Sequence, residues 1–132
     1  MSYAGAAALQ AAVYERLAGW PALAGVPVLD AVPSGVAPET YVLIGPEEAR
    51  DASDKSGAGA EHRMVLSVVS RAAGFAEAKG IAAAISDALT GDGMALARGR
   101  LAGLWFQQAR AQRLDNGALR RIDLTFRARV EL

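Results

Sequence analysis

The sequence contains no cysteine and only one histidine, His62. The absence of cysteine excludes disulfides, thiolate catalysis and cysteine zinc sites. No second histidine or cysteine is present to complete a triad or a zinc set with His62. We therefore expect His62, at the start of a predicted strand, to be a surface or hydrogen-bonded residue. We also expect no catalytic residue, no metal and no cofactor.

The sequence also lacks a long hydrophobic run, so no segment is long enough to cross a bilayer as a helix. Residues 1–19 have no basic n-region and carry Glu15 and Arg16 within their apolar pattern, unlike a secretory signal peptide. Hydrophobic residues make up 52% and charged residues 21% of the 132 residues, as in an ordinary globular protein. These features predict one soluble domain, residues 1–132, that does not bind membranes.

The net charge is zero, but the charges are unevenly distributed. Residues 1–60 contain three basic and seven acidic residues, a balance of −4, whereas residues 61–132 contain eleven and seven, a balance of +4. One interpretation is that solvated strand faces carry the arginines. A nucleic-acid site is disfavoured, because DNA-binding domains usually have a net basic charge. A second interpretation is that one surface complements another surface of a neighbouring copy.

Residues 61–89 predict a strand followed by a helix. In residues 61–71, Met64, Leu66 and Val68 recur at period two, and valines make the opposite face partly apolar, as in a central strand. Residues 75–89 carry apolar side chains three or four positions apart, and Gly91 is available as a C-terminal cap. This helix has one apolar face, which a sheet is expected to cover.

Three elements are predicted before this unit. A helix is expected from Ser2, its N-cap, because apolar side chains recur at helical spacing over residues 6–17. Residues 26–32 predict a short edge strand, since prolines interrupt and close it. Residues 40–44 predict a buried strand that ends at Gly45-Pro46.

After this unit, short and long strands are predicted at residues 94–98 and 101–113. Trp105 and Phe106 are adjacent in the long strand and therefore point to opposite faces. Ordinary core is favoured over an interface anchor for this pair, with one ring buried and the other near a rim. Asp115-Asn116-Gly117 predicts a hairpin turn, because Asn and Gly tolerate positive φ.

The last strand has the clearest alternation in the chain. Its core face is predicted to carry Ile122, Leu124, Phe126, Ala128, Val130 and Leu132. Its opposite face, solvated or in contact with a partner, is predicted to carry Arg121, Asp123, Thr125, Arg127, Arg129 and Glu131. Together the elements predict an α+β fold: a mostly antiparallel sheet with two main helices packed on it in a single domain.

Residues 47–60 are predicted to form a flexible acidic loop, because they lack an apolar period. Their charged side chains are Glu47, Glu48, Asp51, Asp54 and Lys55. A solvated acidic loop is favoured over a calcium loop, since a lysine occupies a position that should offer oxygen and the glycine and distal glutamate have the wrong offsets. The nearby glycines are too few for a phosphate-binding loop.

The order of elements resembles one known family, the tail-terminator or tail-completion proteins of long-tailed phages and gene transfer agents. The resemblance covers the first helix, the Pro-rich strand followed by Tyr41-Val42-Leu43-Ile44-Gly45, strand 63–70, the helix beginning Phe75-Ala76-Glu77-Ala78, and the terminal hairpin. It implies a structural protein without enzymatic activity. The implied assembly is a hexameric ring that caps the tail tube and contacts the major tail tube protein and the head-tail connector protein. It also implies assembly in the bacterial cytoplasm and a final place at the head-proximal end of the tail.

Such a ring would let DNA pass without binding it specifically, and carboxylates on the channel wall would repel phosphate. The acidic loop is therefore a candidate for that wall. The candidate ring, tail-interface or lumen residues are Glu47, Glu48, Asp51, Asp54, Lys55, Arg110, Arg113, Arg120, Arg121, Arg127 and Arg129. Reversal of Arg120 and Arg121 to glutamate is expected to weaken assembly more than folding.

Two alternatives remain open at this point. The first is a head-completion or connector adaptor, which also forms rings but lies on the portal side of the joint. The second is a small enzymatic or ligand-binding α+β domain that uses the sheet and helices as a pocket. The absence of cysteine, the single histidine and the lack of a convergent polar motif weigh against the second.

Overall fold

The computed structural model describes residues 3–55 and 57–132, and these form one five-stranded sheet with two α-helices. The strands lie in the order β1-β2-β3-β5-β4, and every neighbouring pair is antiparallel except β1 and β2, which are parallel. The elements in chain order are α1 (Ala6–Ala18), the 3-10 turn η1 (Pro21–Leu23), β1 (Val28–Leu29), β2 (Thr40–Asp51), β3 (Gly59–Ser70), α2 (Ala76–Thr90), β4 (Arg100–Leu114), η2 (Asp115–Gly117) and β5 (Leu119–Glu131). The predicted α+β class, with two helices on a mostly antiparallel sheet in one domain, is confirmed.

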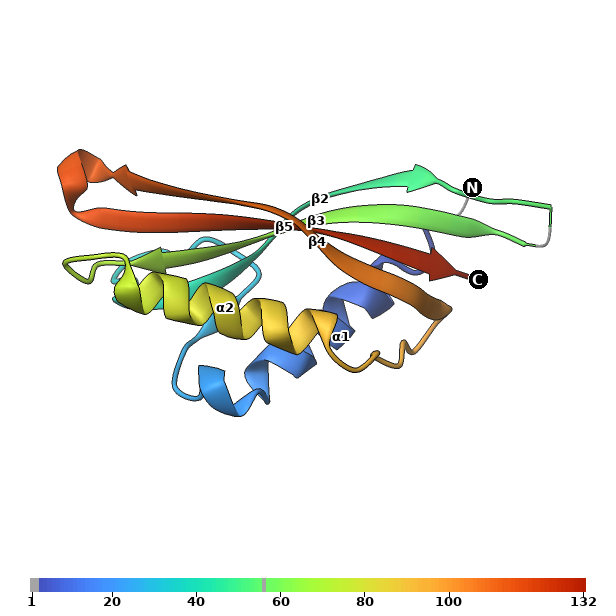
Figure 1. Ribbon diagram of the computed structural model, residues 1–132, viewed down its shortest axis with the longest axis horizontal. Helices are drawn as coiled ribbons and strands as arrows, with labels where there is room; N and C mark the ends of the chain where they lie inside the picture. The colour runs from blue at the N-terminus through green and yellow to red at the C-terminus, as the bar shows by residue number, and fades with distance from the viewer. Residues whose placement is uncertain (1–2, 56) are drawn as a thin grey trace.

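Both helices lie on one side of the sheet, and the other side is bare (Figure 1). Helix α1 buries the four predicted apolar residues, Ala6, Leu9, Val13 and Leu17. Its N-cap is Gly5, whereas the predicted cap, Ser2, lies outside the described residues. Helix α2 buries seven side chains and ends at the predicted cap, Gly91. The two apolar helix faces therefore cover a single face of the sheet, which becomes the core.

The core is centred on β3 and β5, which occupy the middle of the sheet. Met64, Leu66 and Val68 of β3 are buried, as the period-two pattern predicts. The predicted core face of β5 is buried from Ile122 to Val130, whereas Leu132, beyond the end of the strand, is 43% exposed. Each large side chain buried in this way contributes roughly 1.5–3 kcal/mol to the free energy of folding.

The predicted end of the strand at Gly45-Pro46 is wrong, and so is part of the predicted acidic loop. Strand β2 continues through these residues to Asp51, and the pairing with β3 changes register between Ile44 and Glu47. A bulge at this point accommodates the proline and the positive φ of Gly45, so the pairing of β2 with β3 resumes at Glu47. Glu47 to Asp51 therefore lie in a strand, and only residues 52–58 connect it to β3.

The edges of the sheet also differ in part from the predictions. Strand β1 is at an edge as expected, but it has two residues and runs parallel to β2. The strand predicted at residues 94–98 does not form, because Met94 and Leu96 pack individually against the core from a loop. That loop ends at Gly99, whose φ is +79° and where a Cβ would lie 2.8 Å from the Glu131 carbonyl oxygen.

The hairpin between β4 and β5 is confirmed. Asp115, Asn116 and Gly117 all have positive φ, at 55°, 54° and 87°. These residue types tolerate that backbone region, which explains the turn. Strand β4 then pairs with β5 along its whole length, with two further bulges after Leu101 and Phe106. Its other side has no strand partner in the described part of the chain, so a fifteen-residue strand forms the edge.

Candidate functional site

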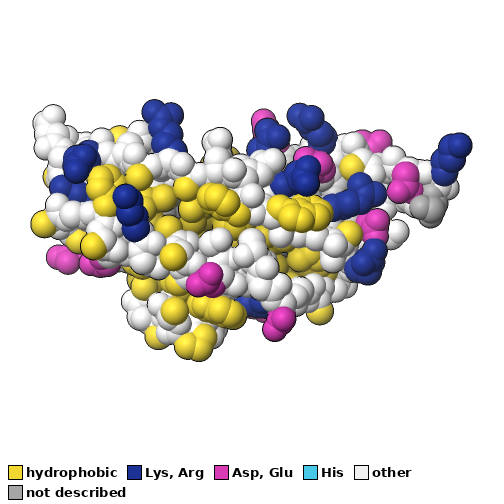
Figure 2. All heavy atoms as spheres, viewed as in Figure 1, with side chains coloured by type: hydrophobic (Ala, Val, Ile, Leu, Met, Phe, Trp, Pro, Cys, Tyr) yellow, Lys and Arg dark blue, Asp and Glu magenta, His cyan; other side chains and the backbone are white. Residues whose placement is uncertain are grey.

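We call the side of the sheet away from α1 and α2 the open face. Basic side chains project along it, with acidic side chains among them over part of its length, at the upper rim of the view in Figure 2. Strand β5 contributes the predicted charged row to this face, and most of its side chains are only partly buried. The solvated face predicted for β5 is therefore present, whereas Ser67 and Val69 of β3 and Leu43 of β2, which lie on the same face, are buried.

The acidic residues predicted to line one wall do not share a surface. Glu47 points to the helix side, where its Oε1 accepts a hydrogen bond of 2.7 Å from His62 Nδ1. Glu48 is exposed opposite Arg63. Since successive strand residues point to opposite faces, a strand cannot present both carboxylates together. Glu47 therefore lies on the helix side and Glu48 on the open face.

The other charged residues of this segment lie near the tip of the β2–β3 hairpin. The hydroxyl and the backbone N–H of Ser53 both donate to Asp51 and lower the pKa of its carboxyl group. Asp54 lies 3.7 Å from Arg129 of β5, and Lys55 is exposed. The fold therefore brings together Asp54 and Arg129, two predicted site residues that are far apart in the sequence.

Most arginines on the open face have acceptors or rings within the same chain. Arg121 donates to Asp123 at 2.9 Å and to Ser67 at 3.1 Å. Arg129 pairs with Glu131 as well as with Asp54. These pairs partly neutralise the charge of the arginines. The face is therefore expected to bind DNA more weakly than its number of arginines suggests, because DNA binding depends on basic groups that displace counterions from phosphate.

Two predicted arginines lie on the helix side instead. Arg113 stacks over the Phe75 ring at 5.0 Å. Arg120 donates to the Ala73 carbonyl at 2.8 Å and also to the Gly117 carbonyl. Arg120 therefore ties the β4–β5 turn to the segment before α2, which the strand pattern did not indicate.

Replacing Arg120 by glutamate is therefore expected to weaken folding directly, by about 2–3 kcal/mol, because two charge-assisted hydrogen bonds are lost. Arg110, on the open face opposite Asp123, is the matched control. Its reversal is expected to cost less than about 1 kcal/mol, mainly through cross-strand repulsion. Urea unfolding of both variants measures the difference. Equal losses would show that the Arg120 contacts contribute nothing.

The most exposed part of the sheet is the edge segment, residues 105–111 of β4. All seven residues are exposed, on both faces of the strand. Trp105 is 45% exposed beneath Arg127, whose guanidinium lies 4.7 Å from the ring centroid. Phe106 is 46% exposed and packs edge-on against Phe126 on the helix side. The rings do point to opposite faces, but the prediction that this pair belongs to the core is wrong, because Trp105 lies on the open face, which no helix covers, and Phe106 is half exposed at the edge strand.

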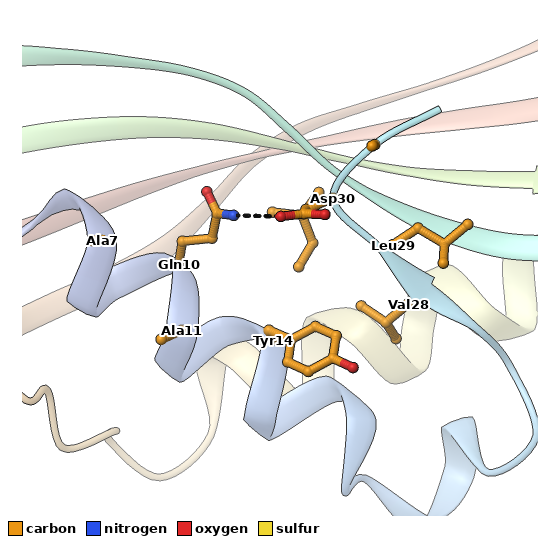
Figure 3. A pocket seen from close by; sticks show the side chains of 9 residues that line it. Ala7, Gln10, Ala11, Tyr14, Val28, Leu29 and Asp30 are labelled. Atoms are coloured by element: carbon orange, nitrogen blue, oxygen red, sulfur yellow. Dashed lines mark hydrogen bonds between the residues drawn. The ribbon is translucent and has the colours of Figure 1, made fainter. Parts of the chain in front are cut away.

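An apolar groove lies at the opposite edge of the sheet, between α1 and β1 (Figure 3). We call it the α1–β1 groove. Ala7, Gln10, Ala11 and Tyr14 form one wall, and residues 28–31 with Ile44 form the other. Its volume is about 570 Å³, and its charged side chain, Asp30, accepts a hydrogen bond of 3.4 Å from Gln10. The sequence pattern missed this groove because its walls come from separate segments.

His62 and the acidic side chains do not gather as a metal site in the described part of the chain. His62 is fully buried and contacts Glu47, which agrees with the prediction of a hydrogen-bonded residue. Across residues 3–55 and 57–132, no three acidic, histidine or cysteine side chains gather as a metal site. No helix in that part of the chain has the length and apolar character needed to span a bilayer.

Comparisons with known proteins identify the family. The chain matches the family described as tail completion protein gp17 over residues 11–131. It is also similar to a chain of a solved structure, the virion of a native gene transfer agent particle, with 59% identity and a TM-score of 0.89. That match covers 99% of this chain and 100% of the other. No curated protein matches. The family match spans nearly the whole sequence, and the chain therefore belongs to the tail completion protein gp17 family.

Proposed function

We propose that this protein is a tail terminator, a ring of identical subunits that caps the tail tube of a phage-like particle and joins it to the head connector. The family and the similarity to a gene transfer agent virion chain establish the coarser role, that of a structural tail completion protein and not an enzyme. The ring, its six-fold symmetry and its place at the head-proximal end are our proposal. The match to a virion chain over its full length is the observation that carries it.

The shape of the subunit supports a ring. A closed ring of identical subunits needs a head-to-tail contact between two different patches of the same protein. The two edges of this sheet provide different surfaces, the exposed edge segment on β4 and the apolar α1–β1 groove beside β1. A repeated contact between them closes a ring when the rotation from one subunit to the next divides a full turn evenly.

The charge of the open face supports passage of DNA without specific binding. Its arginines are interspersed with carboxylates, and Arg121 and Arg129 are each paired with one. A strong DNA-binding surface instead presents unpaired basic groups that displace many counterions. We accordingly propose that DNA crosses the ring without being held, whichever residues line the channel.

Particles assembled without the protein test the proposal. We expect tails of uncontrolled length, or tails that never join heads, because an open stack of subunits keeps growing unless a differently shaped ring occupies its end. Electron microscopy of a deletion strain measures both properties. Complementation with the intact gene is the control.

Two outcomes would contradict the proposal. Normal-length tails attached to full heads would exclude a terminator. Normal-length free tails beside leaking heads would move the protein to the head side and favour the connector adaptor. The principal partner would then be the connector protein instead of the major tail tube protein.

A further inference from the structure

We propose that the edge segment of one subunit seats in the α1–β1 groove of the next copy, with Phe106 as the anchoring side chain. The proposal rests on the ring described above and names its subunit contact. It assigns a partner, a second copy of this chain, to the two apolar surfaces that the fold leaves uncovered.

The edge segment has the features of an interface anchor. Seven consecutive exposed residues include two large aromatic side chains, and the strand they belong to has an unpaired outer edge. Phe106 is already held edge-on against Phe126, with ring centroids 5.8 Å apart. A side chain fixed in this way loses little conformational entropy on binding, which favours association.

The groove has the features of a receptor for an apolar side chain. It is lined mainly by carbon, and Tyr14 on its rim is 46% exposed. Val32, which follows the groove residue Ala31 in the sequence, is 75% exposed. Exposed apolar side chains grouped around a hollow indicate a contact site more strongly than the same side chains scattered singly.

The two surfaces also have opposite charge. Asp30 is the charged residue that lines the groove. Arg110 is the charged residue of the edge segment. Opposite charges on two facing patches favour their encounter and exclude contacts between like patches, such as groove with groove.

The geometry fits a repeated contact. The groove lies beside β1 and the edge segment lies on β4, at opposite edges of one sheet. Phe106 points to the same side of the sheet as the helices, and α1 forms a wall of the groove on that side. The same contact can therefore repeat from subunit to subunit with the helix side of every sheet facing the same way, as a head-to-tail ring requires.

Cysteine cross-linking tests the contact, because the natural chain has no cysteine. The variant carries Gln107→Cys in the edge segment and Ala11→Cys in the groove, two exposed positions. A short bis-maleimide applied to purified particles is expected to give a ladder of linked subunits. The matched control pairs Gln107→Cys with Ala83→Cys, an exposed position on α2, and is expected to stay monomeric. No ladder in particles that contain the variant, or an equal ladder from the control, would overturn the proposal.

Two further variants identify the anchor. Phe106→Ser is expected to weaken subunit association about thirtyfold, the loss typical of a central aromatic anchor. Gly103→Ala moves Trp105 instead, because a Cβ there would lie 2.4 Å from the indole. It is expected to retain the ladder. Loss of the ladder with Gly103→Ala but not with Phe106→Ser would overturn the assignment of Phe106.

The interface and the proposed function can fail separately. A deletion strain with defective tails, combined with no ladder in complemented particles, would leave the terminator role standing and reject this contact. A ladder in particles whose tails do not depend on the protein would support the contact and reject the terminator role.

Discussion

Replacing His62 by alanine is expected to lower the free energy of unfolding by about 3–4 kcal/mol, because a buried ring is removed and a partner is left unpaired. His62 is fully buried on β3, and its Nδ1 donates to Glu47 Oε1 at 2.7 Å. Its Nε2 has no hydrogen-bond partner among the described residues. The variant therefore loses packing and also leaves the Glu47 carboxylate, 17% exposed, without its donor.

A double-mutant cycle separates the hydrogen bond from the packing. Glu47→Ala and His62→Ala should be coupled by about 1–2 kcal/mol, since both remove the same contact. Glu48→Ala is the control, because Glu48 is exposed on the opposite face and should add independently to His62→Ala. Chemical unfolding of the five variants gives the coupling energies. Additive losses for Glu47 and His62 would show that their contact does not stabilise the fold.

The sequence predicts the central part of this fold well. The period-two pattern of β3 and β5 and the helical spacing of α1 and α2 are local signals, and burial follows them closely. The Asp115–Gly117 turn is also encoded locally, by residues that accept positive φ. Apolar periodicity and turn chemistry agree in these elements, so the sequence alone specifies them.

Local signals fail where a distant partner decides the structure. Gly45-Pro46 normally ends a strand, but β3 offers a pairing edge beyond it, and a bulge restores the register. Polar residues 47–51 form a strand for the same reason. Residues 94–98 have a strand-like composition but form a loop, because Met94 and Leu96 pack against the core individually instead of pairing with a strand.

The candidate site is less predictable than the fold. Charge composition identifies the arginine-rich half, but the acceptor of each arginine comes from another segment. Arg120 contacts the Ala73 carbonyl, and Arg129 lies near Asp54, through contacts that sequence spacing does not encode. The α1–β1 groove likewise requires the packing of two separate elements. The exposure of Trp105 and Phe106 depends on which side of the sheet the helices cover and on the edge position of β4, which local composition does not reveal.

Replacing Phe126 by alanine is expected to cost about 3–5 kcal/mol of folding free energy. Phe126 is fully buried on β5, where Met64 of β3 and Phe106 of β4 are its cross-strand partners. The cavity would open at the centre of the sheet, where strands on both sides limit collapse. A fall in melting temperature of about 10 °C or more should follow for a domain of this size.

Phe106→Ala is the matched control for this variant and also bears on the role of the edge segment. Phe106 touches the same ring but is half exposed, so its loss should cost only about 1 kcal/mol. A large stability loss from Phe106→Ala would mean that the side chain is needed for the subunit's own fold. A small loss would leave most of its apolar surface without a stabilising role in the monomer. Phe106 would then be an aromatic ring that the fold does not need, held in place by Phe126, which the fold does need. Such a pre-positioned ring suits an interface between copies.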